Sequence, residues 1–368
     1  MARKVVVAMS GGVDSAVAAA LLKRQGCEVI GVTLRLFAEK RGAVKCCGGA
    51  ESADRARACA DALGIRHYFK SAQDLFSKTV IDDFVKGYLA GSTPNPCVEC
   101  NRHLKFDYLL QLARSLGAEA LATGHYAVIK REAGEWGLYR GADPLKDQSY
   151  FLYCLRRETL PSVLFPLGAM EKKDVRRIAA ELSLPAASAP ESNDICFVTE
   201  GNYDDYLKRY AGVKPRPGDI VDMRGRRLGR HEGFFNFTVG QRRGTGVYGG
   251  ERLYVVEIRP ETNEVVLGPL EAARSSAFRL RDINWLAGPA AGEFRTAVQI
   301  RYRHKPAACS VSAAGAGAEV RLDEPQFALA PGQSAVFYDG DRVLGGGIIC
   351  AGSVKGKDRP GPAEDNEK

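Results

Sequence analysis

Short apolar runs alternate with helical segments in the first part of the chain. Residues 5–8 are consecutive apolar positions rich in β-branched side chains, which is typical of a strand buried on both faces. A glycine follows each of the first two helical segments, Gly26 after one and Gly64 after the other. The pattern predicts strands over 5–8, 28–37 and 65–69 and helices over 16–23 and 51–63. This order is typical of an α/β fold with a doubly wound parallel sheet.

The pattern continues and then changes towards the C-terminus. It predicts a helix over 73–90, a further helix that ends at Gly117, and a third over 170–182. It also predicts a strand over 118–123 and a hairpin over 127–140. From about residue 214, short β-branched strands and turn glycines replace the helices, which suits a small β-rich region and then a closed barrel or sandwich. We predict a catalytic domain over 1–205, a basic central domain over 206–272, a C-terminal β-barrel over 275–354 and a disordered tail over 355–368.

The turn after the first strand carries a chemical signal. It runs through Ser10, two glycines, Asp14 and Ser15 into a helix, so backbone N–H groups converge where the positive helix terminus can hold an anion. Capping alone would explain Ser10 and Asp14 but not the adjacent glycines and second serine. The Lys-Ser/Thr pair of a Walker loop is missing. The order Ser-Gly-Gly-x-Asp-Ser resembles the PP-loop of the ATP pyrophosphatase superfamily, whose members cleave ATP to AMP and pyrophosphate.

Composition and charge narrow the function class. With 368 residues, 45% hydrophobic and 26% charged, the chain is expected to fold around more than one core. No run of about 18 apolar residues occurs, and the first strand leaves no room for a signal peptide, so we expect a cytoplasmic protein without membrane contact. The net charge of +8 is uneven, since ten Lys/Arg face three Asp/Glu between Lys208 and Arg243. This block is a candidate phosphate-backbone footprint, with a solvated basic face as the alternative. The aromatic residues that interleave with it are Tyr210, Phe234, Phe235 and Phe237.

Ten cysteines in a chain without a signal peptide indicate reduced thiols, metal binding or redox chemistry. Cys97 and Cys100 form a Cys-x-x-Cys pair in a segment with two prolines, which predicts a rigid loop. A thioredoxin-type pair would instead need a helix starting at the first cysteine. A third interpretation pairs one of these thiols with Cys196 for persulfide or iron–sulfur chemistry. Structural zinc would need further ligands from Cys46, Cys47, His103 or Cys196.

Several motifs occur in a fixed order along the chain. They lie at 10–15, 93–106, 122–126, 146–152 and Cys196, and the series extends through 237–243, 301–303 and 331–338. Together they resemble the tRNA-specific 2-thiouridylase family (MnmA/TrmU), and the match covers nearly the whole chain. The resemblance implies an ATP-dependent sulfurtransferase that thiolates C2 of the wobble uridine in tRNAs for Lys, Glu and Gln.

The resemblance also implies a mechanism. ATP with Mg²⁺ would adenylate the C2 oxygen, because a carbonyl oxygen is a poor leaving group. Cys196 would carry a persulfide, and Cys100 would be the nucleophile that frees its sulfur and closes a Cys100–Cys196 disulfide. That disulfide must be reduced in each turnover. The sulfur donor would be a cysteine desulfurase, directly or through relay proteins.

The same resemblance implies ligand contacts at individual positions. ATP would be bound by Ala8, Met9, Ser10, Gly11, Gly12, Val13, Asp14, Ser15, Leu34 and Gly124. The target uridine, flipped out of its stack, would lie against Asn95, Pro96 and Cys97. Other tRNA contacts would be His125, Lys146, Asp147, Gln148, Arg301, Tyr302 and Gln333. For Leu34 the alternative is an ordinary core residue, and for His125 a structural histidine at a strand end.

One position departs from the family's pattern. Cys97 stands where many members have Asp, so Cys97, Cys100 and Cys196 could bind three corners of a [4Fe–4S] cluster and leave one iron open to sulfide. The disulfide cycle is the first interpretation and the cluster is its rival, since three thiolates in one cleft also suit sulfur relay.

Two other function classes stay open. A PP-loop ligase that forms amides would need ATP but no cysteines. A zinc-stabilised RNA-binding protein would bind tRNA through the basic block and release no pyrophosphate from ATP. The basic middle and the β-rich end argue against the ligase, and the phosphate-binding turn argues against binding alone.

Overall fold

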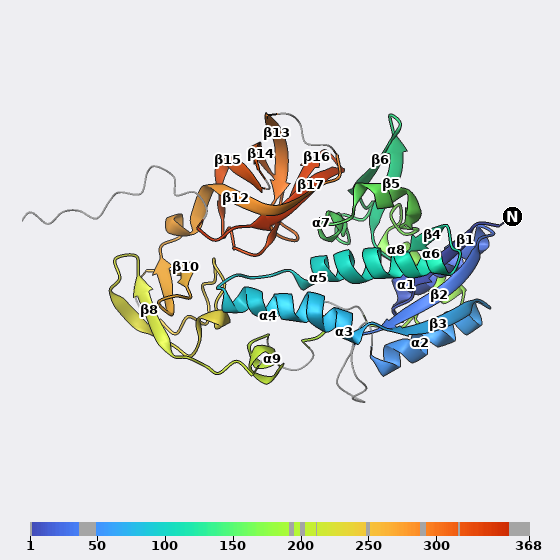
Figure 1. Ribbon diagram of the computed structural model, residues 1–368, viewed down its shortest axis with the longest axis horizontal. Helices are drawn as coiled ribbons and strands as arrows, with labels where there is room; N and C mark the ends of the chain where they lie inside the picture. The colour runs from blue at the N-terminus through green and yellow to red at the C-terminus, as the bar shows by residue number, and fades with distance from the viewer. Residues whose placement is uncertain are drawn as a thin grey trace, which may run out of the picture.

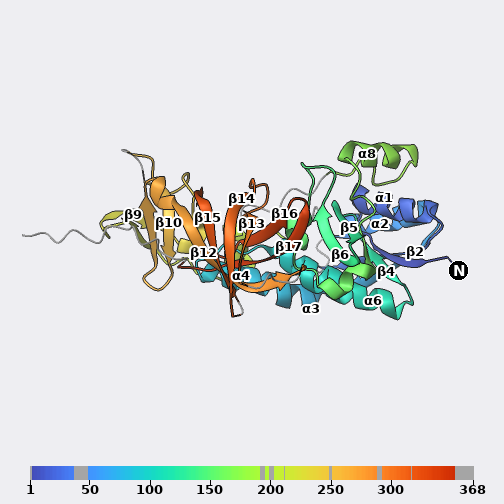
Figure 2. The same cartoon turned by 90° about the horizontal axis from the view of Figure 1, so that it is seen from above.

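The computed structural model describes residues 2–36, 49–190, 195–198, 203–210, 212–247, 251–287, 292–315 and 317–352 (Figure 1). Cys46, Cys47 and the predicted tail over 355–368 lie outside these residues. The molecule is elongated, with an α/β domain at one end, a small β-sheet at the other and a barrel between them (Figures 1 and 2). In the stretches that the structure describes, no helix combines the length and apolar character needed to span a membrane.

The predicted parallel sheet is confirmed. β1 (Lys4–Ala8) lies between β2 (Glu28–Arg35) and β4 (Ala120–Ala122), with β3 (Arg66–Ser71) and β7 (Val163–Leu164) at the edges, and every pairing is parallel. Side chains alternate across a strand, so Val5 and Val7 pack against one helical layer and Val6 against the other. All three valines are completely buried, as expected for the central strand of a doubly wound sheet.

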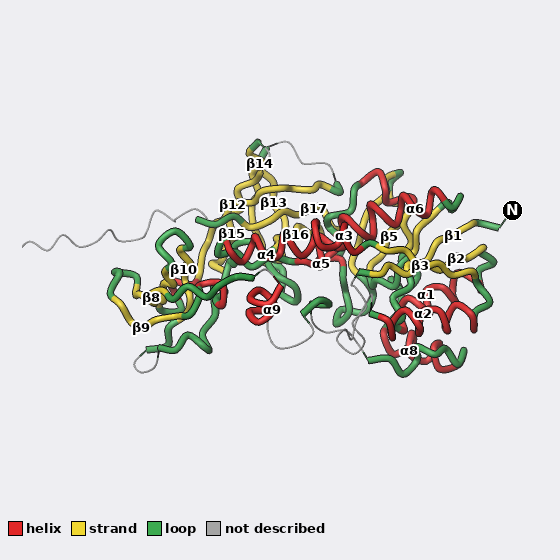
Figure 3. Tube along the Cα trace, turned by 60° about the horizontal axis from the view of Figure 1, so that its bottom comes forward, coloured by secondary structure: helices red, strands yellow, loops and turns green. Residues whose placement is uncertain are grey.

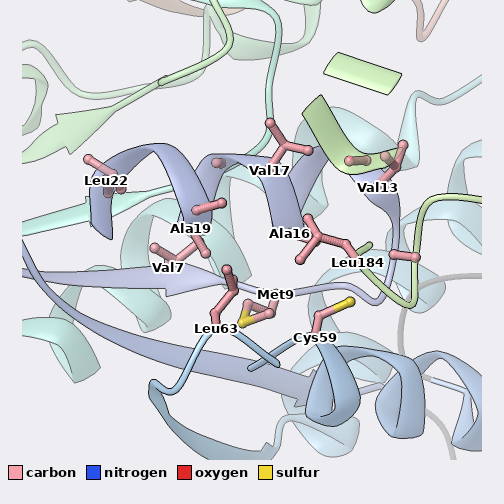
Figure 4. Close-up of a cluster of buried hydrophobic side chains, with 14 of the residues drawn as sticks. Val7, Met9, Val13, Ala16, Val17, Ala19, Leu22, Cys59, Leu63 and Leu184 are labelled. Atoms are coloured by element: carbon pink, nitrogen blue, oxygen red, sulfur yellow. The ribbon is translucent and has the colours of Figure 1, made fainter. Parts of the chain in front are cut away.

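One helical layer consists of α1 (Val13–Arg24), α2 (Ala50–Ala62) and α8 (Lys172–Glu181), with the buried residues of all three in a single cluster. Figure 4 shows Val13, Ala16 and Val17 of α1 close to Leu184, which follows α8. The alanines of α1 are small enough to bring its backbone close to the sheet. This contact places the start of α8 beside the start of α1.

Two long helices run side by side from the parallel sheet towards the barrel (Figures 1 and 3). The first joins α3 (Gln73–Phe76), the π-helical η1 (Ser77–Ile81) and α4 (Asp82–Leu89). The second joins α5 (Pro96–Glu99), the π-helical η2 (Cys100–Tyr108) and α6 (Leu109–Ser115), which covers the other face of the sheet. Shorter helices are α7 (Ser149–Leu152), α9 (Tyr203–Tyr210) and three 3-10 turns at Arg157–Ser162, Phe234–Asn236 and Glu271–Ala273.

The prediction of a loop around Cys97 and Cys100 is wrong. Pro96 is the first residue of α5, so both thiols lie on the helix that continues to Ser115. Proline suits the first helical position, because its φ is already helical and its missing N–H would have no intrahelical partner there. The helix that a thioredoxin-type pair requires at its first cysteine is therefore present, contrary to the prediction.

The central domain is a four-stranded sheet in the order β10-β11-β8-β9. Its strands are β8 (Gly218–Asp222), β9 (Arg227–His231), β10 (Tyr254–Arg259) and β11 (Glu264–Gly268), and only β8 and β11 pair in parallel. Ile220, Val255, Val265 and Leu267 form its small core together with Phe237.

The C-terminal domain is a closed antiparallel barrel, which confirms that prediction. Its strands follow the order β12-β15-β14-β13-β16-β17, and pairing of β12 with β17 closes the ring. The predicted hairpin, β5 (Ala127–Glu132) and β6 (Glu135–Arg140), belongs to the α/β part of the chain but pairs with β17 through Leu138 and Tyr139. The barrel strands are β12 (Arg274–Trp285), β13 (Glu293–Gln299), β14 (Ala307–Ala314), β15 (Gly317–Phe327), β16 (Ser334–Asp339) and β17 (Arg342–Ile349).

Candidate active site

The turn between β1 and α1 has the geometry of a phosphate cradle. Ser15 Oγ accepts the Ser10 N–H at 3.1 Å and donates to the Gly12 carbonyl at 3.0 Å, which fixes the loop from inside. Gly12 is the N-cap of α1 and offers no side chain, so it caps none of the N–H groups that follow it; Ser10 Oγ accepts only the N–H of Gly12 itself, at 3.4 Å. The simple capping interpretation is therefore wrong, and the loop can offer these N–H groups to an anion.

Gly11 is required by both backbone and packing. Its φ is +78°, and a Cβ built there would lie 2.0 Å from the carbonyl oxygen of Ser52. Arg55 of α2 donates from Nε to the Gly11 carbonyl at 3.0 Å. The cradle is thus clamped from α2 by a cation that the sequence motif does not include.

Asp14 is paired inside the protein. Lys172 Nζ lies 2.7 Å from Asp14 Oδ1 and 2.8 Å from Oδ2, and the Tyr126 hydroxyl donates to Oδ1 at 2.7 Å. The motifs singled out Asp14, but sequence reasoning missed Lys172, which lies 158 positions away in an ordinary Lys-Lys pair. The local sequence indicates only that Lys172 lies near the start of a predicted helix, and it does not indicate a partner for the side chain.

Gly124 and His125 follow β4 beside the cradle. A Cβ at Gly124 would lie 2.7 Å from the backbone carbonyl carbon of Asp14, so this glycine lets α1 approach closely. His125 is buried between Thr123 Oγ1, 2.6 Å from its Nδ1, and Lys105 Nζ, 3.3 Å from its Nε2. Burial, assisted by the Lys105 charge, holds the pKa of His125 well below its usual value, so the ring is neutral.

Cys100 and Cys196 pack against one buried aromatic cluster, although they are far apart in the chain. We call this the thiol cluster; its buried members include Phe76, Phe84, Leu104, Phe197, Leu207 and Phe235. Phe197 anchors the turn that carries Cys196, with its ring centroid 5.1 Å from that of Phe84. Both thiols are half-buried, whereas Cys97 is exposed. The two cysteines that the resemblance singled out therefore border the same cluster.

The three thiols do not fit a ready iron–sulfur site. Among the described residues, no three His, Cys, Asp or Glu side chains gather closely enough to hold a metal ion. Cys97 and Cys100 are three positions apart on one helix, with Cys97 exposed at its first turn.

Leu34 links the two halves of the site. It lies near the end of β2, next to β1 in the sheet, and packs against both the core under the sheet and the thiol cluster. It is partly buried and packs against apolar residues, and its contact with adenine stays a prediction.

The predicted tRNA residues are spread over several parts of the structure. Asp147 is buried and accepts hydrogen bonds from Arg140, Gly141 and Ser149, while Gln148 accepts the Tyr126 N–H at 3.0 Å. Lys146, half-buried, precedes them. Tyr302 lies against Phe151, with ring centroids 4.5 Å apart. Asp147 and Gln148 thus hold the loop before α7, beside Tyr126 and the cradle.

A cavity of about 820 Å³ lies where the three domains meet. Thr93 is its central contact, since its N–H donates to the Pro331 carbonyl at 2.7 Å and its carbonyl accepts Gln333 Nε2 at 2.8 Å. Its hydroxyl donates to Thr238 Oγ1 of the central domain at 3.3 Å. Arg301 and Gln333 line this cavity together with Thr238 and Gln241. Asn95 instead lines a second cavity of about 240 Å³ with Glu99 and Ser334.

Two of the aromatic residues of the basic block are buried and do not lie on its surface. Phe235 is buried in the thiol cluster, and Phe237 is buried in the core of the central sheet. The side chain of Tyr210 lies outside the described residues. Arg224, Arg242 and Arg243 are exposed. The exposed part of the block that these residues form is therefore charged. Phe235 also fastens the central domain to the thiols.

Three family models match consecutive parts of the chain. The one described as tRNA methyl transferase HUP domain matches residues 3–200, the tRNA methyl transferase PRC-barrel domain matches 204–269, and the aminomethyltransferase beta-barrel domain matches 275–349. The tRNA-specific 2-thiouridylase MnmA of Methylorubrum extorquens (strain PA1) is 50% identical over 361 residues, with 94% of this chain and 93% of that protein covered. The protein of the same name from Carboxydothermus hydrogenoformans is 47% identical, with 94% of this chain and 97% of that protein covered. The one from Geobacter metallireducens is 45% identical, with 96% of this chain and 98% of that protein covered.

Proposed function

The chain belongs to the tRNA-specific 2-thiouridylase family, and on that premise we propose that it uses ATP to replace the C2 oxygen of a tRNA wobble uridine by sulfur. The substrates are tRNAs of the Lys, Glu and Gln type. The observation that carries the proposal is the meeting of two sites: a phosphate cradle after β1, and the thiols of Cys100 and Cys196 on one cluster that Leu34 joins to the same sheet.

The first step activates the base. The C2 oxygen of uridine attacks the α-phosphorus of ATP, the bond between that phosphorus and the bridging oxygen breaks, and its electron pair leaves with pyrophosphate. The N3 proton of the base is released to solvent. Convergent N–H groups at the start of α1 suit the charge that develops on the pyrophosphate.

The second step delivers sulfur. The terminal sulfur of a Cys196 persulfide attacks C2, the electron pair of the C2–N3 double bond moves to N3, and N3 takes a proton from solvent. The Cys100 thiolate then attacks Sγ of Cys196. The S–S bond of the persulfide breaks with its electron pair on the sulfur held by C2, and a Cys100–Cys196 disulfide forms. Collapse at C2 expels AMP and leaves the thiocarbonyl. An external dithiol supplies two electrons and two protons to reduce the disulfide.

The residues of the site suit a bound Mg²⁺ but do not fit an iron–sulfur cluster. Asp14 supplies a carboxylate at the cradle. A Mg²⁺ ion is typically held by one or two carboxylates together with phosphate oxygens and water, so Asp14 would be one of its ligands. The ion would offset the negative charge of the phosphates. The thiols do not fit a cluster, as described above, so we derive no step through one. The sulfur donor is a cysteine desulfurase or a relay protein that reaches Cys196.

The test measures two products separately, pyrophosphate and 2-thiouridine, with unmodified tRNA, ATP and a persulfide donor. Cys100→Ser and Cys196→Ser should abolish thiolation and keep pyrophosphate release, because the cradle does not depend on the thiols. Cys27→Ser, a half-buried cysteine outside the thiol cluster, serves as the control.

Other outcomes identify the alternatives. An ATP-dependent product other than 2-thiouridine that still forms after both cysteine changes favours a PP-loop ligase, whose chemistry needs no thiols. Binding of tRNA without any pyrophosphate release favours a non-catalytic RNA-binding protein. An iron count and absorption spectrum after anaerobic purification decide the cluster question, and active protein without iron rules the cluster out.

A further inference from the structure

The phosphate cradle lacks a lysine in its motif, yet the fold supplies one. A Walker loop places its lysine beside the phosphates from within the motif, and that residue is absent here. Lys172 reaches the same region from α8, with Nζ at 2.7 Å and 2.8 Å from the two carboxylate oxygens of Asp14. Asp14 is the second residue of α1, within the turn whose N–H groups form the cradle.

Lys172 is held in place by its surroundings. It is the first residue of α8, and its backbone N–H donates to Asp143 Oδ2 at 3.0 Å, which fixes the start of the helix. Val175 and Ile178 of α8 lie in the same buried cluster as Val13 of α1. The positions of both helix ends are therefore set by a shared core, so the lysine is presented to the cradle without a flexible loop.

A second cation lies at the cradle beside the pair formed by Lys172 and Asp14. The side chain of Lys172 is 12% exposed and that of Asp14 is 32% exposed, so the lysine is mostly withdrawn from water while the carboxylate is still accessible. Asp14 is shared between Lys172 and the Tyr126 hydroxyl. Arg55 adds a second cation, bound to the Gly11 carbonyl. The cradle and its immediate surroundings thus hold two cations, Lys172 and Arg55, and two carboxylates, of which Asp14 pairs with the Lys172 ammonium and Asp143 accepts the Lys172 backbone N–H.

We infer that Lys172 is the cation that contacts the β- and γ-phosphates of ATP and stabilises the pyrophosphate as it leaves. The inference rests on the proposed function. When the bond between the α-phosphorus and the bridging oxygen breaks, the Lys172 ammonium stabilises the negative charge left on pyrophosphate. Asp14 orients the ammonium before the phosphates bind. Lys172, which is distant in sequence, thus supplies the positive charge that the motif lysine supplies in a Walker loop.

The alternative is that Lys172 only ties α8 to α1. The experiment is therefore designed to separate contact with phosphate from support of the fold. The variant is Lys172→Met, and its matched control is Lys173→Met, since Lys173 is the next residue on the same helix, with a side chain 76% exposed and paired with Glu171. Measurements are tRNA-dependent pyrophosphate release, product inhibition by pyrophosphate, and the affinities for ATP and AMP.

Lys172→Met should lower kcat/KM for ATP by about 10²–10³-fold, the usual effect of removing one group that stabilises developing charge. It should also weaken pyrophosphate inhibition at least about tenfold and leave AMP affinity within about twofold, because AMP lacks the β- and γ-phosphates. Lys173→Met should match the original chain. Unchanged release by Lys172→Met, or equal losses of ATP and AMP affinity, would overturn the inference.

A second measurement uses the unmodified chain and so does not depend on the variant's folding. Lysines are acetylated with and without saturating pyrophosphate or AMP and read by mass spectrometry. Pyrophosphate should lower labelling of Lys172 relative to Lys173 at least about threefold, and AMP should not. Equal labelling with pyrophosphate and AMP would overturn the inference. If the unmodified chain releases no pyrophosphate with any tRNA, the proposed function itself fails, which is a different result.

Discussion

Gly124→Ala tests whether close approach of α1 to the end of β4 positions the cradle. A Cβ at this position would lie 2.7 Å from the Asp14 carbonyl carbon and 2.8 Å from the Ser15 N. Ordinary contacts of a Cβ begin at about 3.4 Å, so α1 must move by roughly 0.7 Å. The neighbouring atoms are backbone and cannot rotate away, so the first turn of α1 itself is displaced.

The size of the effect follows from that displacement. A shift of this order in groups that orient a reacting phosphate costs up to about 10²-fold in rate, so kcat/KM for ATP in pyrophosphate release should fall about 30–100-fold. Overpacking should also cost about 1–3 kcal/mol of the free energy of unfolding. Thiolation should fall in parallel, because it follows the activation step.

The assay is tRNA-dependent pyrophosphate release at several ATP concentrations, with urea unfolding as the measure of stability. Gly229→Ala is the matched control, since a Cβ there meets only Val247 Cγ2 at 3.5 Å and Ile220 Cδ1 at 4.0 Å. It should leave both rate and stability nearly unchanged. If Gly124→Ala is folded and within about threefold of the original activity, the steric argument for this glycine is refuted.

Four further substitutions test other parts of the structure. Gly11→Ala combines a φ of +78° with a Cβ 2.0 Å from the Ser52 carbonyl oxygen, so it should cost about 2–4 kcal/mol in urea unfolding; a loss below about 0.5 kcal/mol would contradict this. The pKa of His125 is lowered in the folded chain, so below about pH 6.5 the unfolded chain binds a proton at this residue and the folded chain does not. The free energy of unfolding therefore falls with falling pH, by up to about 1.4 kcal/mol per pH unit for this group. His125→Asn should reduce the loss between pH 8 and pH 5.5, and an unchanged pH dependence would refute the assignment. Arg242→Ala and Arg243→Ala remove exposed charges, so each should weaken tRNA binding and lower the slope of log affinity against log salt by about one; an unchanged slope would show that the side chain contacts no phosphate.

The layered architecture follows from local pattern. Val5, Val6 and Val7 have no polar alternation, and a strand that is apolar on both sides has to be covered on both sides, which is what a parallel sheet between helices provides. The glycines of the cradle were equally informative, because a backbone at φ +78° against another backbone leaves no room for a side chain. Such features depend on a few neighbouring residues.

Other features escaped prediction because they depend on distant partners or on a choice between two local rules. Proline after helix 73–90 indicated a break, but the same residue type also favours the first turn of a helix, and Pro96 follows the second rule. Phe235 and Phe237 stood among arginines as if on a surface, yet each is buried by a separate part of the fold. A residue's burial depends on what packs over it, and the local pattern does not specify that.

By itself, the sequence determined the order of strands and helices, the anion-binding turn and the kinds of side chain available for chemistry, because backbone conformation and hydrophobic period are properties of short segments. Only the tertiary structure decided that Lys172 pairs with Asp14, that Cys100 and Cys196 share one cluster, and that Thr93 joins three domains. These pairs are separated by long stretches of chain, and their contacts exist because whole helices and sheets bury their apolar faces together.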